Sequence, residues 1–203
     1  MSSNLELLHS VFSAATHDAS AAMSFWTKGL VTLSLDEVRE LPLEEVVSSE
    51  LEEKLLNMVV LTLDEESGGT IVLTFDDNSG RQLASILLSQ PLPEEGTEWN
   101  ELEKSALLET GNILGCAYIG AIAKCVEQTL TPSPPYFLQD YAASVLEQAI
   151  IEQATYTEKI LICQTRFLQK NEEVNWNVFF IPSFCLRQKM EQSLQFDEKL
   201  SDC

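Results

Sequence analysis

The chain has 203 residues, enough for one large domain or two small ones with a sizeable core. It carries 12 Lys and Arg against 32 Asp and Glu, a formal net charge of −20. Such an acidic surface repels phosphate backbones and anionic lipids, so we expect neither nucleic acid nor a membrane as a partner. Hydrophobic residues make up 45 % of the chain, which is ordinary for a globular protein and excludes a disordered acidic tail.

Targeting signals and cysteine spacing indicate the compartment. Residues 1–6 lack the basic and apolar regions of a secretory signal. The longest apolar run, residues 113–123, is shorter than the ~20 residues that cross a bilayer. The 5 cysteines show no CxxC spacing, so we expect reduced and mostly buried thiols, and no metal site. The sequence therefore predicts a cytosolic protein.

The first half of the chain predicts a helix, a strand, a short helix or turn, a two-stranded hairpin and a further helix. Three- and four-residue spacing of apolar residues indicates the helices, and alternation together with a Gly-containing turn indicates the hairpin. The expected ranges are 5–30, 31–36, a turn or short helix from Pro42, 57–63, 70–75 and 80–89.

The second half repeats this order after a Pro- and Gly-containing joint over residues 90–96. Its long helix has Thr97 as the expected N-cap, because acidic residues follow in the first turn. The expected ranges are 98–130, 136–138, 141–154, 159–168, 174–181 and 184–194.

This parallel order predicts an internal duplication within a single domain over residues 1–203, with repeats at about 5–90 and 96–195. The fold class is α+β: helix, strand, helix, hairpin and helix, twice. We expect both repeats to share one antiparallel sheet, with the two long helices packed together on one of its faces.

The long second helix carries the candidate site. Ser105, Glu109, Asn112 and Cys116 follow at three- and four-residue steps, nearly opposite the apolar face, so they point away from the core. A carboxamide both donates and accepts hydrogen bonds, so it could hold a water in line with a phosphorus centre. On spacing alone, a solvated Glu and Asn on an exposed helix face is the commoner explanation.

Three glycines also mark this helix. Gly111, Gly115 and Gly120 each cost about 1 kcal/mol relative to Ala in a helix interior, which indicates close approach of another backbone. The expected neighbour is the first helix, through small residues such as Ala15 and Ala19.

The motif Ser105-x3-Glu109-x2-Asn112, followed after 22 intervening residues by Pro135, resembles the CheC/CheX/FliY family of response-regulator phosphatases. Residues 41–46 and 136–146 and both hairpins also look like CheC. The resemblance implies a CheC-like fold and dephosphorylation of the phospho-aspartate of CheY-like receiver domains in chemotaxis or two-component signalling.

In the mechanism implied by this resemblance, Asn112 orients the attacking water and Glu109 pairs with the receiver's lysine. Ser105 and Pro135 are supporting elements of the motif. The phosphorylated aspartate and the Mg²⁺ belong to the receiver, so no cofactor of the chain's own is implied.

Two-site members of the family carry Glu-x-x-Asn on both long helices, but here Ser10 and Ser13 stand in the first helix. We therefore predict one active site per chain and a degenerate first site. His9 and His17 flank Ser13; solvated helix histidines explain them better than a metal site.

The second motif also departs from the family, which continues Glu-Ile-Gly-Asn-Ile-Gly-Ala-Gly. Thr110 replaces Ile, Tyr118 lies on the core face, and Cys116 stands beside Asn112 on the exposed face. An inert thiol is the preferred interpretation of Cys116, and a thiol that tunes or blocks the site is the alternative.

The competing hypothesis is a non-catalytic CheC-like adaptor that binds a receiver or a CheD-like receptor deamidase. A FliY-like flagellar switch role ranks third, because the extra domain that accompanies it has no room in this length. Other enzyme classes lack a recognisable motif.

Overall fold

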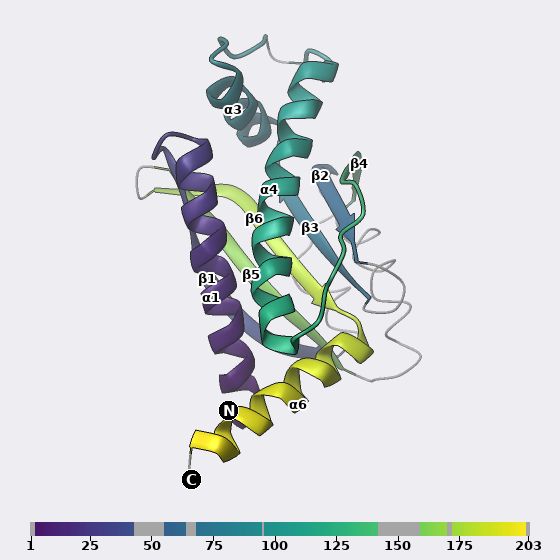
Figure 1. The fold of residues 1–203 in the computed structure, drawn as a ribbon. Coiled ribbons are helices and arrows are strands. Elements are labelled where there is room, and N and C mark those ends of the chain that lie inside the picture. The colour runs from purple at the N-terminus through teal and green to yellow at the C-terminus, as the bar shows by residue number, and fades with distance from the viewer. Residues whose placement is uncertain are drawn as a thin grey trace.

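The computed structural model describes residues 3–42, 55–63, 68–94, 96–141, 159–169 and 172–201. The expected short helix or turn after Pro42 and most of the expected helix over 141–154 lie outside these residues. Within them, helices and strands follow one another in the expected order (Figure 1). Their bounds are α1 Ser3–Trp26, β1 Val31–Pro42, β2 Leu55–Thr62, β3 Gly69–Phe75, α3 Asp77–Leu88, α4 Glu101–Val126, β4 Tyr136–Tyr141, β5 Lys159–Gln169, β6 Glu172–Pro182 and α6 Phe184–Ser201.

All six strands join one antiparallel sheet in the order β1-β5-β6-β3-β2-β4. The counterparts in the two repeats are β1 and β4, β2 and β5, and β3 and β6. If each strand is replaced by its counterpart, the same order is obtained, read from the opposite edge of the sheet. The outer strand of each repeat pairs with the hairpin of the other, β1 with β5 and β4 with β2. This is the arrangement expected of a duplicated unit, and the predicted fold class is confirmed; the repeat boundaries stay a prediction.

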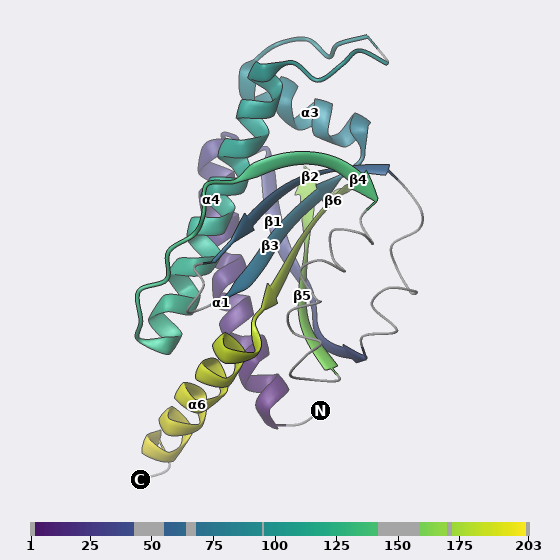
Figure 2. The ribbon, with the colours of Figure 1, turned by 90° about the vertical axis from the view of Figure 1, so that its right-hand side faces the viewer.

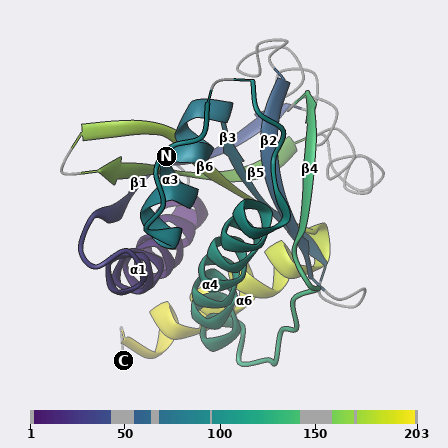
Figure 3. The same cartoon turned by 90° about the horizontal axis from the view of Figure 1, so that it is seen from above.

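The long helices α1 and α4 lie side by side and antiparallel on one face of the sheet (Figures 1 and 2). Seen from above, both helices lie on the same side of the strands, with α3 near the first turns of α4 (Figure 3). The last helix, α6, crosses the opposite end of this pair and contacts both helices. The expected packing of two long helices on a shared sheet is therefore confirmed.

Alternation along the strands divides the core into two clusters. Val59 and Leu61 of β2 belong to the large cluster under α1 and α4. Met58 and Val60, their neighbours along the strand, belong to a smaller cluster on the opposite face. The side of β2 that faces the helices is thus fixed by the register of the sheet.

Several expected boundaries are wrong because strand pairing, which local sequence does not encode, sets them. β1 continues to Pro42, since it pairs with β5 along its whole length. β4 continues through Tyr141, where a helix was expected to begin.

None of the described cysteines forms a disulfide bond, but the expectation that they are mostly buried is wrong. Cys163 is buried, Cys125 is half-buried, and Cys116 and Cys185 are exposed. Both exposed thiols lie on outward faces of helices, α4 and α6.

Candidate functional site

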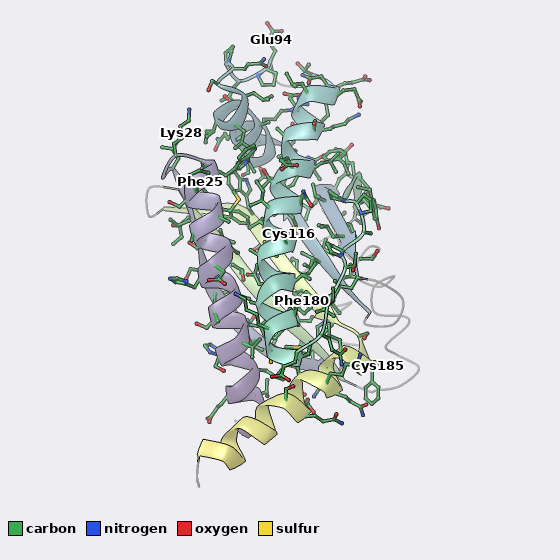
Figure 4. All side chains as sticks on the ribbon, in the orientation of Figure 1. Phe25, Lys28, Glu94, Cys116, Phe180 and Cys185 are labelled. Atoms are coloured by element: carbon green, nitrogen blue, oxygen red, sulfur yellow. The ribbon has the colours of Figure 1, made fainter. Side chains whose placement is uncertain are left out.

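The predicted site lies on the outward face of α4. Ser105, Glu109 and Cys116 are exposed and Asn112 is half-buried. Figure 4 labels Cys116 midway along this helix, in front of the sheet. Within the described part of the chain, the Glu109 carboxylate forms no ion pair, so its charge faces solvent. The outward placement of this group is confirmed, whereas the roles of Glu109 and Asn112 stay a prediction.

Two glycines allow α4 to pack closely against the sheet. A Cβ at Gly111 would lie 2.4 Å from Cγ1 of Val59, and one at Gly115 would lie 2.7 Å from Cδ2 of Leu61. The close approach is as expected, but the expected partner is wrong: the glycines meet side chains of β2, and not the small residues of α1. A Cβ added at Gly120 would have no other atom within 4 Å.

Contact between α1 and α4 includes a buried cluster of hydroxyl groups. The Tyr118 hydroxyl is 2.9 Å from Oγ1 of Thr16 and 2.5 Å from Oγ1 of Thr165 in β5. Tyr118 is fully buried, which confirms its expected position on the core face. Burial raises the pKa of Tyr118 and raises the pKa of the neighbouring Cys163 to about 12. Both groups are therefore protonated at neutral pH and take no part in proton transfer at the surface.

A capping box fixes the start of α4. Oδ1 of Asn100 accepts hydrogen bonds from the backbone N–H of Leu102 and Glu103, and Oε2 of Glu103 accepts from the N–H of Asn100. The expected N-cap Thr97 is wrong, since its hydroxyl donates to the carbonyl of Glu94. The signature Asn100-x-x-Glu103 was readable in the sequence and was missed.

A buried arginine ties this helix start to α3. Nη1 of Arg81 donates to Oε2 of Glu103 at 2.8 Å, and both side chains are 7 % exposed. The guanidinium also lies 4.1 Å from the centre of the Trp99 ring and donates to the Thr97 carbonyl. These contacts hold the first turn of α4, immediately before the stripe that carries Ser105 and Glu109.

Asn112 has a hydrogen-bonding partner on its own helix. The Cys116 thiol donates to Oδ1 of Asn112 across 3.8 Å, one helical turn away. Spacing of four residues permits this contact, but the sequence does not reveal it.

Pro135 lies at the sheet edge beside the strand on which α4 rests. It is half-buried and directly precedes β4, which pairs with β2. The backbone N–H of Ser133 donates to the carbonyl of Thr62 at 2.8 Å, and the Thr62 N–H donates to Oγ of Ser133 at 3.0 Å. β2 thus contacts both α4 and β4, the strand that begins directly after Pro135.

The first helix repeats the burial pattern of α4. When α1 is aligned with α4 so that Ser10 matches Glu109, Ser13 matches Asn112 and His17 matches Cys116. Under this alignment eight buried positions, seven in α1 and one directly after it, match eight buried positions of α4. They are Leu8, Val11, Phe12, Ala15, Thr16, Ala19, Met23 and Thr27, matched by Leu107, Thr110, Gly111, Leu114, Gly115, Tyr118, Ile122 and Val126.

At this equivalent position the side chains differ in chemistry. Ser10 and Ser13 are exposed, but a hydroxyl carries no negative charge and lacks the reach of an amide. His17 is exposed and lies 3.5 Å from Oδ1 of Asp18. Among the residues that the structure describes, no three His, Cys, Asp or Glu side chains lie close enough to hold a metal ion.

By length and composition alone, α4 could cross a membrane, and no other described helix has this property. Half of its apolar stretch is nevertheless buried inside the fold, where it packs on α1 and β2. Packing in the core of the fold therefore accounts for the apolar residues of α4.

Sequence comparison finds a local match. No protein-family model matches the chain. A region of 93 residues, 45 % of this chain, is 26 % identical to the CheY-P phosphatase CheC of Bacillus subtilis (strain 168). This region covers 44 % of that protein, so the match spans less than half of the length of this curated relative.

Structural similarity extends over nearly the whole chain. FliY of Thermotoga maritima matches with a TM-score of 0.71 and 16 % identity over 96 % of this chain and 97 % of its own. A chain of the FliG–FliM complex from H. pylori matches with a TM-score of 0.65 and 14 % identity over 93 % and 99 %. A chain of the CheX–CheY–BeF3–Mg²⁺ complex from Borrelia burgdorferi matches with a TM-score of 0.56 and 16 % identity over 84 % and 96 %. The chain therefore resembles the CheC, CheX and FliY proteins, in fold over most of its length and in sequence over the region matched to CheC.

Proposed function

We propose that the protein is an aspartyl-phosphate phosphatase that acts on a CheY-like receiver domain. The observation that carries this proposal is the pair of Glu109 and Asn112 on the outward face of a helix that is seated firmly on a sheet. The local similarity to CheC and the presence of CheY in the complex with the related CheX fold support it.

The chemistry follows from the two functional groups. The Asn112 carboxamide would enter the receiver's active site and align a water with the phosphorus atom, because it both donates and accepts hydrogen bonds. The Glu109 carboxylate would pair with a lysine of the receiver and hold the helix in register. Water attacks the phosphorus and the bond to the aspartyl oxygen breaks, so aspartate and phosphate are released. Catalysis is then mainly positioning.

The substrate supplies the remaining parts. Phospho-aspartate and its Mg²⁺ reside on the receiver, so the phosphatase contributes no metal ligand and no nucleophile. One such site per chain is proposed, because Ser10 and Ser13 replace the carboxylate and the amide on α1. With a receiver as its partner, the protein would act in the cytoplasm.

The direct test is loss of phosphate from a phosphorylated CheY-like receiver with wild-type protein, Glu109→Ala and Asn112→Ala. Both variants are expected to lose most of the acceleration, with Asn112→Ala lowering kcat and Glu109→Ala weakening receiver binding as well. Ser10→Ala and Ser13→Ala serve as matched controls at the equivalent positions of α1 and are expected to retain wild-type rates. Equal rates for all four variants would exclude the proposed site.

A non-catalytic adaptor is the second candidate, and the likeness to a chain of the FliG–FliM complex favours it. In this role the same fold would bind a protein partner, a receiver or a CheD-like deamidase, without accelerating dephosphorylation. Receiver binding with unchanged phosphate lifetime would support the adaptor over the phosphatase.

A further inference from the structure

We propose that Cys116 is a positioning residue, which holds the carboxamide of Asn112 in one orientation for catalysis. This inference rests on the proposed function and adds a residue to the site through its contact with Asn112. Both side chains lie on the solvent face of α4, separated by one helical turn. The thiol donates to Oδ1 across 3.8 Å.

The contact leaves the amide chemically competent. A carboxamide oxygen has two lone pairs and its nitrogen has two N–H donors. The thiol occupies one lone pair, so the other can accept a hydrogen bond from the attacking water while both N–H groups face the receiver. Because a thiol is a weak donor, it leaves the basicity of the oxygen largely intact.

Orientation is the quantity that the contact controls. The terminal torsion of an Asn side chain is broad and roughly two-fold, so an amide without a partner presents its oxygen and its nitrogen interchangeably. Fixing the oxygen toward the C-terminal end of α4 removes one of these two orientations before the receiver binds. Ordering a side chain in advance lowers the entropic cost of reaching the reactive geometry.

Kinetics on the phosphorylated receiver test this role. Cys116→Ala is expected to lower kcat by about two- to five-fold with KM unchanged, the size of effect for loss of a weak hydrogen bond. Cys116→Ser, which retains a donor, is expected to stay within about two-fold of wild type. Cys185→Ala, at a second exposed thiol among the described residues, is the matched control and is expected to have no effect.

A double-mutant cycle separates positioning from a general structural effect. In the Asn112→Ala background, Cys116→Ala is expected to cause no further loss, since the group that it orients is gone. An equal loss in both backgrounds would overturn the inference. If Asn112→Ala itself retains wild-type activity, the proposed function fails first.

A second readout is independent of activity. The side-chain NH₂ resonances of Asn112, assigned with Asn112→Ala, report the order of the amide in ¹⁵N relaxation experiments. In Cys116→Ala these resonances are expected to shift and to show greater mobility, with recovery in Cys116→Ser. Unchanged resonances in Cys116→Ala would overturn the positioning role whether or not the protein is an active phosphatase.

Discussion

Gly111 of α4 rests directly on Val59 of β2, so closely that a Cβ on the glycine would lie 2.4 Å from Cγ1 of the valine. The valine cannot easily yield, because a β-branched side chain has few accessible rotamers. Asn112 is the next residue along the helix, so this contact sets how far the proposed catalytic amide stands from the sheet.

Gly111→Ala is therefore expected to destabilise the fold although it improves helix propensity. Overpacking against Val59 should outweigh the gain of about 1 kcal/mol from propensity and leave a net loss of about 1–2 kcal/mol. Gly120→Ala is the matched control, since its added methyl meets no atom within 4 Å, and it should stabilise by about 0.5–1 kcal/mol. Urea unfolding measures both values.

Relief of the clash provides a further check. Val59→Ala combined with Gly111→Ala should cost less stability than the two single changes added together. Val59→Ala removes the Cγ atoms with which the new methyl group would clash, and that methyl group fills part of the space left by the valine. Strict additivity would show that Gly111 and Val59 do not press on each other.

The ion pair between Arg81 and Glu103 is expected to stabilise the start of α4. Glu103→Gln keeps a group that accepts from Asn100, but it leaves the buried guanidinium with only the longer, more exposed ion pair to Asp77. We therefore expect a loss of about 1–3 kcal/mol. Lys104→Met removes the exposed pair with Glu101 and should cost less than about 0.5 kcal/mol. Similar losses in thermal or urea unfolding would contradict this assignment.

Alkaline pH is expected to destabilise the protein through two buried acids. Burial raises the pKa of Cys163 from 9.0 to about 12 and also raises the pKa of Tyr118. Above pH 9 the unfolded chain loses protons that the folded chain keeps, so the free energy of unfolding falls as pH rises from 9 toward 12. Each group adds a slope of up to about 1.4 kcal/mol per pH unit.

Urea unfolding between pH 8 and 11 compares the slopes of three variants with that of wild type. Cys163→Ala and Tyr118→Phe should each flatten the dependence on pH relative to wild type, whatever they do to stability at pH 8. Cys185→Ala, at an exposed thiol, should follow the wild-type slope. Parallel curves for all the variants would contradict the role of burial.

Rebuilding the first site is expected to restore catalysis. In the Asn112→Ala background, Ser10→Glu combined with Ser13→Asn places a carboxylate and an amide on α1 at the positions equivalent to Glu109 and Asn112. Phosphate release should rise about ten-fold above the background, since positioned groups supply most of the catalysis. The reversed pair, Ser10→Asn with Ser13→Glu, has the same composition and should stay at background. Equal rates for the two pairs would contradict the equivalence.

Local patterns predicted the elements and the orientation of the site. Alternating residues on either side of residues 64–69 and 169–173 indicate the two hairpins, and helical spacing indicates that Glu109 and Asn112 point outward. These features depend on neighbours within one or two turns of chain, so the sequence expresses them directly.

Features that depend on distant neighbours could not be derived in this way. The cost of Gly111 in a helix required close contact, but nothing local distinguished α1 from β2 as the partner. Similarly, Arg81 has no local reason to be buried until α3 and the start of α4 meet. Asn100 is different, since its capping box with Glu103 involves residues only three apart and the sequence itself carries this pattern.

The exchange of outer strands between repeats has a consequence for how the chain folds. Val31 of β1 pairs with Gln169 of β5, and the central contact joins β3 to β6. Pairings so distant in sequence slow folding, because a long loop must close before they contribute. As the ribosome releases the chain, β1 has no strand beside it until β5 emerges. During synthesis the edges of β1 therefore have no hydrogen-bonded neighbour until the second repeat is made. The second repeat, which carries Glu109 and Asn112, also supplies the strands that complete the sheet.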